Sequence, residues 1–242
     1  MAILLAALTV ISTAFGGAVA LKSRDKFHLT LGLSAGLLLG LVGFDLWPEV
    51  FQNKRMLGNV PMVSVAILFG FLILHFSERL FGSHEPIDSE YGHEHSHSSI
   101  AGGLGALAMA GHVFLDGVAI GVAYKVSRNL AIAVFIALLV HAFADGLNTV
   151  AMLIKTGHWR ERARYLLIID GLARISGAGF GTYVALSENV VSIYLAVFSG
   201  FLIYLATSHI LPEAHSKHPS KLTFLATGFG IVMMWIVVAA LN

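Results

Sequence analysis

The chain has 242 residues, of which 57% are hydrophobic and 12% are charged, and its mean hydropathy is +0.80. Soluble domains carry about 25% charged residues, so this composition excludes a soluble globular protein and predicts an all-α polytopic membrane protein whose first partner is the lipid bilayer. The formal net charge of +1 gives no reason to expect a nucleic acid partner. The absence of cysteine removes thiolate ligands and disulfides.

Apolar windows of about 20 residues predict transmembrane helices. In chain order we expect eight of them, at 2–21, 29–51, 59–81, 99–124, 129–154, 163–186, 190–211 and 221–241. The length leaves no room for a separate soluble domain, so residues 1–242 are expected to form a single transmembrane domain.

The basic residues of the short connections indicate an orientation, because cytoplasmic loops carry an excess of Lys and Arg. One side holds ten of them: Lys22, Arg24, Lys26, Arg79, Lys155, Arg160, Arg162, Arg164, Lys217 and Lys221. The other side holds four: Lys54, Arg55, Lys125 and Arg128. This split predicts that the first side is cytoplasmic and that both termini lie outside, in an inner or plasma membrane.

One connection, residues 82–98, differs from the others in being long, polar and rich in histidine. Its histidines are His84, His93, His95 and His97. Alternating histidines can bind metal weakly, which favours a cytoplasmic loop that collects or senses metal; a hydrophilic linker is the alternative.

Two copies of the pattern His-x-Phe-x-Asp-Gly lie in the middle of the fourth and fifth apolar stretches. The first copy holds His112 and Asp116, and the second holds His141 and Asp145. Residues four apart share one face of a helix, so each helix presents an imidazole and a carboxylate in one direction. Asn148 lies on the same face as His141 and could supply a further oxygen.

Ionisable groups in the middle of a bilayer are costly, by roughly 2.5–3.5 kcal/mol for a central carboxylate on insertion scales. A bound divalent cation offsets this cost, and two imidazoles with two carboxylates suit Zn²⁺ as well as Fe²⁺, Mn²⁺, Co²⁺ or Ni²⁺. The alternative is that the His–Asp pairs only hydrogen bond between helices. The doubled motif favours a metal site.

A second repeat joins the segments 36–49 and 200–213, which align without a gap and share a Pro-Glu ending. The two segments are predicted to run in opposite directions, and inverted repeats with polar groups at mid-depth are typical of transporters. In this register Asp45 corresponds to His209. Four polar residues of the two segments could line a metal pathway: Asp45, Glu49, His209 and Glu213.

Asp170 and Arg174 lie four residues apart in the sixth stretch. The simpler interpretation is an internal ion pair that lowers the cost of burying both groups. The other is that the guanidinium points at the carboxylates of the metal site and stands in for a second cation.

Taken together, these residues resemble the ZIP (Zrt/Irt-like) family of divalent metal transporters over most of the chain. The family carries His-Asn-x-Pro-Glu-Gly in its fourth span and a second His or Gln plus acidic motif in its fifth. His112 with Asp116-Gly117, and His141 with Asp145-Gly146, match these motifs. The resemblance implies eight spans in a 3+2+3 arrangement, with inverted outer triplets, and often a homodimer.

The sequence departs from the family pattern where Val113, Leu115 and Ala142 replace the family's Asn, Pro and a second polar residue. The residues replaced are those expected to bridge to a second metal, so the resemblance implies one metal rather than two.

We therefore expect a transporter and not an enzyme. It is expected to have no cofactor and to move a divalent cation, with Zn²⁺ as the leading candidate, towards the cytoplasm through a single mid-membrane site. Two alternatives remain. A zinc-dependent intramembrane hydrolase needs an open coordination position and usually a third histidine, and an efflux carrier would use the same ligand types in the opposite direction.

Overall fold

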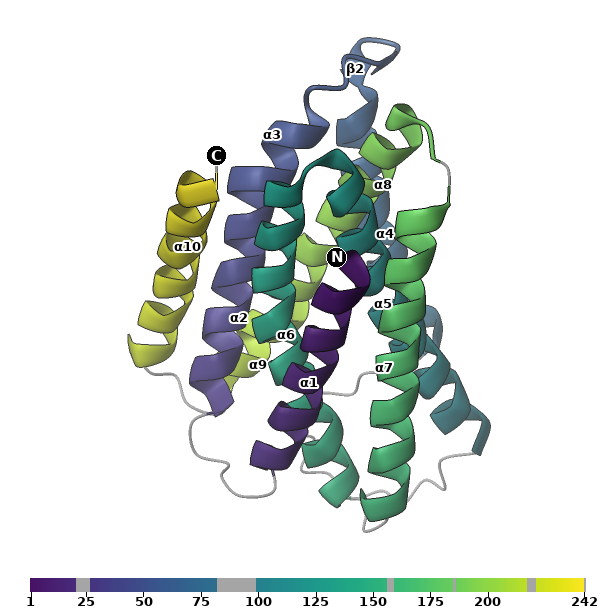
Figure 1. Cartoon of the computed structure of the whole chain (residues 1–242). Coiled ribbons are helices and arrows are strands. Elements are labelled where there is room, and N and C mark those ends of the chain that lie inside the picture. The colour runs from purple at the N-terminus through teal and green to yellow at the C-terminus, as the bar shows by residue number, and fades with distance from the viewer. Residues whose placement is uncertain (21–26, 82–98, 156–158, 185, 217–220, 242) are drawn as a thin grey trace.

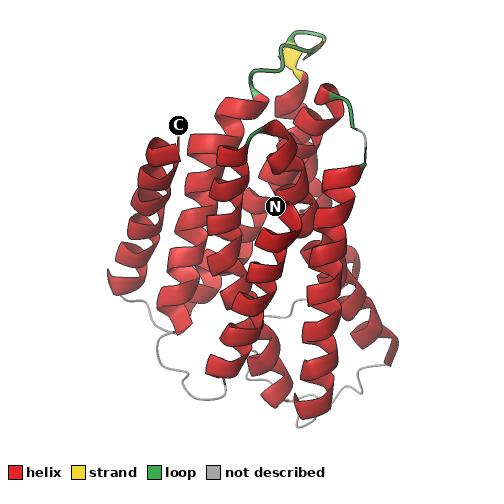
Figure 2. Ribbon diagram, viewed as in Figure 1, coloured by secondary structure: helices red, strands yellow, loops and turns green. Residues whose placement is uncertain are grey.

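The computed structural model describes residues 1–20, 27–81, 99–155, 159–184, 186–216 and 221–241 (Figure 1). Within these ranges the side chains at 20, 27, 77–81, 99–109, 144, 147–155, 159–164 and 216 are not described. Almost all of the described chain is helical, and the long helices lie side by side in one bundle (Figure 2).

The helices follow one another as α1 (Ala2–Ala20), α2 (Phe27–Leu41), α3 (Trp47–Val50), α4 (Met62–Phe81), α5 (Ser99–Val126), α6 (Arg128–Lys155), α7 (Trp159–Tyr183), α8 (Glu188–Tyr204), α9 (Leu211–Ser216) and α10 (Lys221–Leu241). Two π-helical segments, η1 (Val42–Leu46) and η2 (Leu205–Ile210), continue α2 into α3 and α8 into α9. Helices at the predicted apolar stretches are therefore confirmed, with ends that differ by a few residues.

The predicted start of the third stretch, at residue 59, is wrong. A two-stranded antiparallel hairpin of β1 (Met56–Leu57) and β2 (Val60–Pro61) precedes α4. Gly58 makes its turn possible, because its φ of 61° lies in the left-handed region that favours glycine. The helix can begin only after Pro61, which pairs with Met56 as the last residue of the hairpin.

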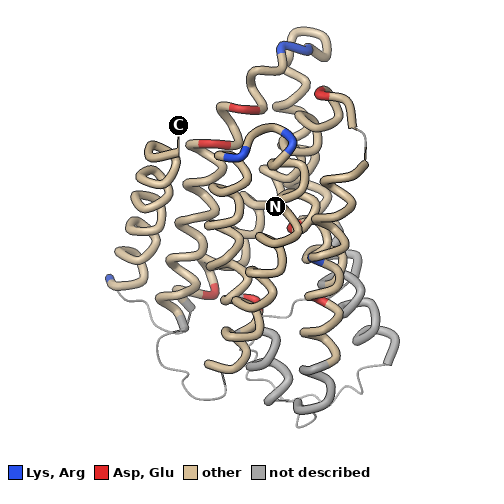
Figure 3. The backbone as a smooth tube through the Cα atoms, in the orientation of Figure 1, with Lys and Arg blue, Asp and Glu red and all other residues tan. Residues whose placement is uncertain are grey.

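Among the described residues, four helical stretches are long and apolar enough to cross a bilayer: Ala2–Val19, His28–Val50, Glu188–His215 and Lys221–Leu241. Two shorter apolar helices, Met62–Phe76 and Arg128–Phe143, lie within the same bundle. Most of the charged positions that Figure 3 colours lie near the two ends of the bundle, and a few lie inside it. This distribution is typical of a membrane-spanning bundle.

Four pairs of helices make the closest contacts: α5 with α7, α1 with α6, α2 with α10, and α4 with α8. Glycines permit this approach. A Cβ added at Gly117 of α5 would collide with the Arg174 backbone of α7, and one at Gly146 of α6 would collide with the Thr13 backbone of α1. Small residues at helix contacts let two backbones approach closely, as is common within membranes.

The glycine contacts occur twice in the same pattern. Gly117 meets the carbonyl of Arg174 and the amide of Ala178, and Gly146 meets the carbonyl of Thr13 and the amide of Gly17. The contacted carbonyl and amide belong to residues four apart in both cases, so α5 packs on α7 as α6 packs on α1. Position 174 of α7 therefore corresponds to position 13 of α1.

The other two pairs of helices repeat in the same way. Gly36 of α2 lies against Thr227 and Gly230 of α10, and Gly200 of α8 lies against Ile67 and Phe71 of α4. Gly36 and Gly200 are the equivalent positions of the repeat found in the sequence.

The two π-helical segments also occupy equivalent positions. Each ends two residues before a proline, Pro48 or Pro212. A proline ring clashes with the carbonyl four residues earlier, which lies inside the π segment in both cases, and a wider turn accommodates that clash. Single π turns of this kind bend a helix and often occur at functional sites.

Replacing Gly117 by alanine tests the close contact of α5 with α7. We expect Gly117→Ala to destabilise the protein by about 1–3 kcal/mol, since the new methyl group must displace backbone atoms of α7. The matched control is Gly111→Ala on the same helix, where nothing lies within 4 Å of an added Cβ. The readout is the midpoint of thermal unfolding in detergent; equal midpoints for the two variants would contradict the packing described.

Candidate metal centre

The turn between α5 and α6 sets the level of the two motif histidines. Ser127 alone separates the helices: its amide donates to the carbonyl of Ala123, and its hydroxyl accepts from the amide of Leu130 at 3.0 Å. Serine is a preferred residue for capping a helix start in this way. Because His112 lies fifteen residues before Ser127 and His141 fourteen after it, the antiparallel helices bring both rings to one level.

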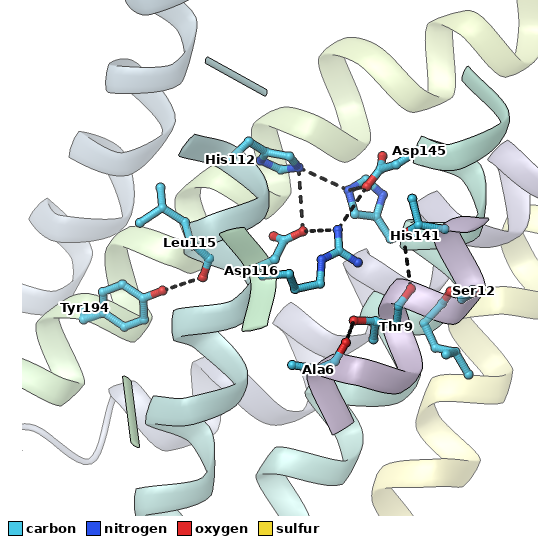
Figure 4. A network of polar contacts seen from close by, with 12 residues as sticks. Ala6, Thr9, Ser12, His112, Leu115, Asp116, His141, Asp145 and Tyr194 are labelled. Atoms are coloured by element: carbon cyan, nitrogen blue, oxygen red, sulfur yellow. Dashed lines mark hydrogen bonds and ion pairs between the residues drawn. The ribbon is translucent and has the colours of Figure 1, made fainter. Parts of the chain in front are cut away.

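The two motifs converge on a single point. The Nε2 atoms of His112 and His141 are 3.4 Å apart, and the rings are almost perpendicular, at 87°. On each helix the carboxylate joins its own histidine: Nε2 of His112 lies 3.8 Å from Oδ2 of Asp116, and Nε2 of His141 lies 3.4 Å from Oδ2 of Asp145. Figure 4 shows the two rings and two carboxylates turned towards one another.

The cluster is buried unevenly. Asp116 is fully buried and His141 almost so, whereas the side chains of His112 and Asp145 are 22% and 17% exposed. Within the described part of the chain, Oδ1 of Asp116 and Nδ1 of His141 are buried and have no hydrogen-bond partner. Buried polar atoms without partners are rare and costly, so the cluster is not a completed hydrogen-bond network.

Arg174 of α7 is the positive charge closest to the carboxylates. Its Nη2 lies 3.3 Å from Oδ2 of Asp116 and 3.6 Å from Oδ2 of Asp145. The side chain is 1% exposed. No ion pair within 4 Å joins it to Asp170, and both residues are described. The guanidinium is therefore directed at the centre of the cluster and not along its own helix.

One atom from each of the four motif side chains, His112, Asp116, His141 and Asp145, lies within 4.8 Å of the other three. Tetrahedral coordination with bonds of about 2.0–2.2 Å requires ligand atoms about 3.3–3.6 Å apart. The two Nε2 atoms, and the pair on α6, already have that spacing. Small side-chain rotations would bring the remaining atoms to it, so the donor set fits a divalent cation.

Of the remaining predicted site residues, Asp45, Glu49, His209 and Glu213 lie in the bundle outside the cluster. Asn148 lies on α6, but its side chain is not described, and the loop histidines His84, His93, His95 and His97 lie outside the described residues. Asp45 lies in η1, and Glu49 in α3 accepts a hydrogen bond from Gln52 at 3.2 Å. His209 lies in η2 with its ring 5.4 Å from that of Tyr204, and Glu213 lies in α9.

Two polar residues that the sequence reasoning missed fasten the site helices to their neighbours. The hydroxyl of Tyr194 on α8 donates to the carbonyl of Leu115 at 2.9 Å, next to Asp116. The hydroxyl of Ser12 on α1 donates to the carbonyl of Leu139 at 2.7 Å, near His141. Single hydroxyls inside apolar stretches carry no pattern, so no signal in the sequence distinguishes these two.

A sequence model of the family described as ZIP zinc transporter matches residues 83–237, which include both motifs. The chain belongs to the ZIP zinc transporter family. The resemblance predicted from the motifs is thereby confirmed. Members of the family are membrane transporters for which the metal ion is a substrate, so the protein is an integral membrane transporter and the hydrolase alternative is wrong.

Several curated proteins resemble the chain over most of its length. Zinc transporter YKE4 of Saccharomyces cerevisiae is 24% identical over 88% of this chain and 73% of its own length. Zinc transporter ZIP9 of Xenopus tropicalis is 28% identical over 81% of this chain and 80% of its own. Zinc transporter ZIP13 of Pongo abelii is 25% identical over 81% of this chain and 62% of its own.

The geometry predicts that the two aspartates differ in structural importance. Asp116→Asn should destabilise the metal-free protein by about 3 kcal/mol, because it removes the nearer carboxylate of a buried guanidinium. Asp145→Asn should cost clearly less, since that carboxylate is farther from Arg174 and partly exposed. Thermal unfolding in detergent with a chelator present measures both. A larger loss for Asp145→Asn would contradict the burial described.

Proposed function

We propose that this protein carries Zn²⁺ across a cell membrane towards the cytoplasm, one ion at a time, through a site formed by His112, Asp116, His141 and Asp145. The convergence of four metal-binding side chains from two adjacent helices carries the proposal. Each helix contributes one imidazole and one carboxylate, so the cation would hold α5 and α6 together when bound. Asn148 is a further oxygen ligand in this proposal.

Zinc is favoured over other divalent cations by two observations. Two imidazoles and two carboxylates that small side-chain rotations would bring to tetrahedral spacing suit Zn²⁺, which is usually four-coordinate and accepts nitrogen and oxygen ligands. YKE4, ZIP9 and ZIP13 are each named as zinc transporters. Fe²⁺, Mn²⁺, Co²⁺ and Ni²⁺ accept the same ligands and are the ions to compare in the assay below.

The proposed arrangement is a single transmembrane transport domain, residues 1–242, with eight spans in a 3+2+3 order and both termini outside. The repeated glycine contacts support it, because α1 packs on α6 as α7 packs on α5, and α2 packs on α10 as α8 packs on α4. The distribution of Lys and Arg between the two sets of connections supports the orientation. Family resemblance adds a homodimer to this proposal.

Polar residues on either side of the centre complete the proposed route. Asp45 and Glu49 would receive the ion on the outer side, and His209 and Glu213 would pass it to the cytoplasm. Asp45 and His209 lie in the two π-helical segments, at equivalent positions of the repeat. The histidines of residues 82–98 would bind the ion weakly on the cytoplasmic side.

The test is zinc flux into proteoliposomes that contain the purified protein. Wild type should take up Zn²⁺, and His112→Ala or Asp116→Ala should lower the rate at least about 100-fold, since each removes one of four ligands. His75→Phe is the control: His75 lies outside the cluster, stacked beside Phe71 with ring centroids 6.4 Å apart, and should transport as wild type does.

Direction and ion are measured in the same preparation. A single cysteine is introduced at Asn59 in the hairpin. A membrane-impermeant thiol reagent then inactivates only those molecules whose hairpin faces the outside of the vesicle. The remaining flux therefore reports one direction of transport at a time. Competition with the other divalent cations gives the order of preference. Normal zinc flux in the His112→Ala variant would overturn the proposed site, and flux only from the predicted cytoplasmic side would overturn the direction.

A further inference from the structure

A single guanidinium lies inside the proposed metal site. The side chain of Arg174 is 1% exposed, and its Nη2 contacts the Oδ2 atoms of both Asp116 and Asp145. Its Nε and Nη1 atoms are buried and have no hydrogen-bond partner within the described chain. The guanidinium is thus held in the bundle by its attraction to the two carboxylates and by few other polar contacts.

Arg174 contacts the same oxygen atoms that a metal ion would use. Oδ2 of Asp116 faces both Nη2 of Arg174 and Nε2 of His112, and Oδ2 of Asp145 faces both Nη2 and Nε2 of His141. A cation bound to the two imidazoles and these oxygens would lie directly beside the guanidinium. Two positive charges at that distance in a buried site repel each other strongly.

The repeated architecture shows that the close helix contact does not need this charge. The position equivalent to Arg174 is Thr13. Gly117 lies against the backbone carbonyl of Arg174, and Gly146 lies against that of Thr13 in the same way. Thr13 is also buried, but it is neutral, and its hydroxyl donates to the carbonyl of Thr9 at 3.1 Å. A neutral residue is therefore compatible with the close helix contact.

The charge count gives the consequence. Two ionised carboxylates and one guanidinium leave the empty site with one net negative charge, whereas two carboxylates alone would leave two. Binding a divalent cation makes the site singly positive with Arg174 and neutral without it. Arg174 therefore stabilises the empty site and opposes the filled one.

We infer that Arg174 is a built-in competitor of the transported cation, which lowers the affinity of the site so that the ion is released readily. This inference rests on the proposed function. It makes Arg174 an affinity-determining residue and not a ligand.

The test is Arg174→Gln in the full-length protein. Zinc titration calorimetry in detergent should give a dissociation constant roughly tenfold or more below that of wild type, because the competing charge is gone. In proteoliposomes the KM should fall and the maximal rate should also fall, since tighter binding slows release. A merely structural role would instead raise the dissociation constant while it lowers the maximal rate.

Three further variants separate charge from shape and from folding. Arg174→Lys keeps the charge and should bind zinc nearly as wild type does. Arg174→Met removes the charge and fills a similar volume, so it supplies the answer where the glutamine variant does not fold. Arg55→Gln removes an exposed charge that directly precedes the hairpin, outside the cluster, and should leave the dissociation constant and the rate unchanged.

The outcomes distinguish the inference from the proposed function. If wild type binds and transports zinc but the folded neutral variants bind no more tightly, the inference about Arg174 is overturned and the transport site stands. If wild type and Asp116→Ala show the same weak zinc binding, the proposed site itself fails, whatever the Arg174 variants do.

Discussion

Two carboxylates inside an apolar bundle have to be matched by positive charge, and this requirement organises the centre of the molecule. Asp116 is fully buried, and Asp145 lies beside it with its side chain 17% exposed. Imidazoles that bind a metal do so in the neutral form, so they can position the carboxylates but add no positive charge to the metal site. Arg174 compensates about half of their charge, and the remainder is available to a cation from solution. A site that is left incompletely neutralised suits an ion that must both enter and leave.

The geometry of that centre depends on how closely the helices approach. Gly117 and Gly177 bring α5 and α7 into backbone contact, and Gly146 and Gly16 do the same for α6 and α1. A helix pair held at such short range has little freedom to slide, because sliding would drive a side chain into the facing backbone. Each site helix is therefore fixed against its own partner, α5 against α7 and α6 against α1, and this fixes the positions of the His and Asp side chains.

The sequence predicts the paired His and Asp because four-residue spacing on a helix is a local property. Nearly equal distances from Ser127, fifteen and fourteen residues, then bring His112 and His141 together. The partner of Arg174 could not be predicted in the same way. Asp170 is one helical turn away and Asp116 is distant in sequence, and only the register of α7 against α5 decides between them. That register comes from glycine contacts between helices, which no periodicity within one helix reveals. The hairpin before α4 is not predicted because its second strand, Val60–Pro61, continues directly into the apolar run of α4.

The backbone contacts of the two halves of the bundle are repeated, but the charged side chains at equivalent positions are not. Equivalent glycines, prolines and π-helical segments place the two halves of the bundle in matching contacts. At equivalent positions, however, Arg174 replaces Thr13 and His209 replaces Asp45. In the proposed transport role, a framework with matching halves would give an ion similar backbone surroundings on either side of the centre. A difference between the two proposed routes would therefore come from such unmatched side chains. Of these, the guanidinium of Arg174 contacts the carboxylates of the centre itself.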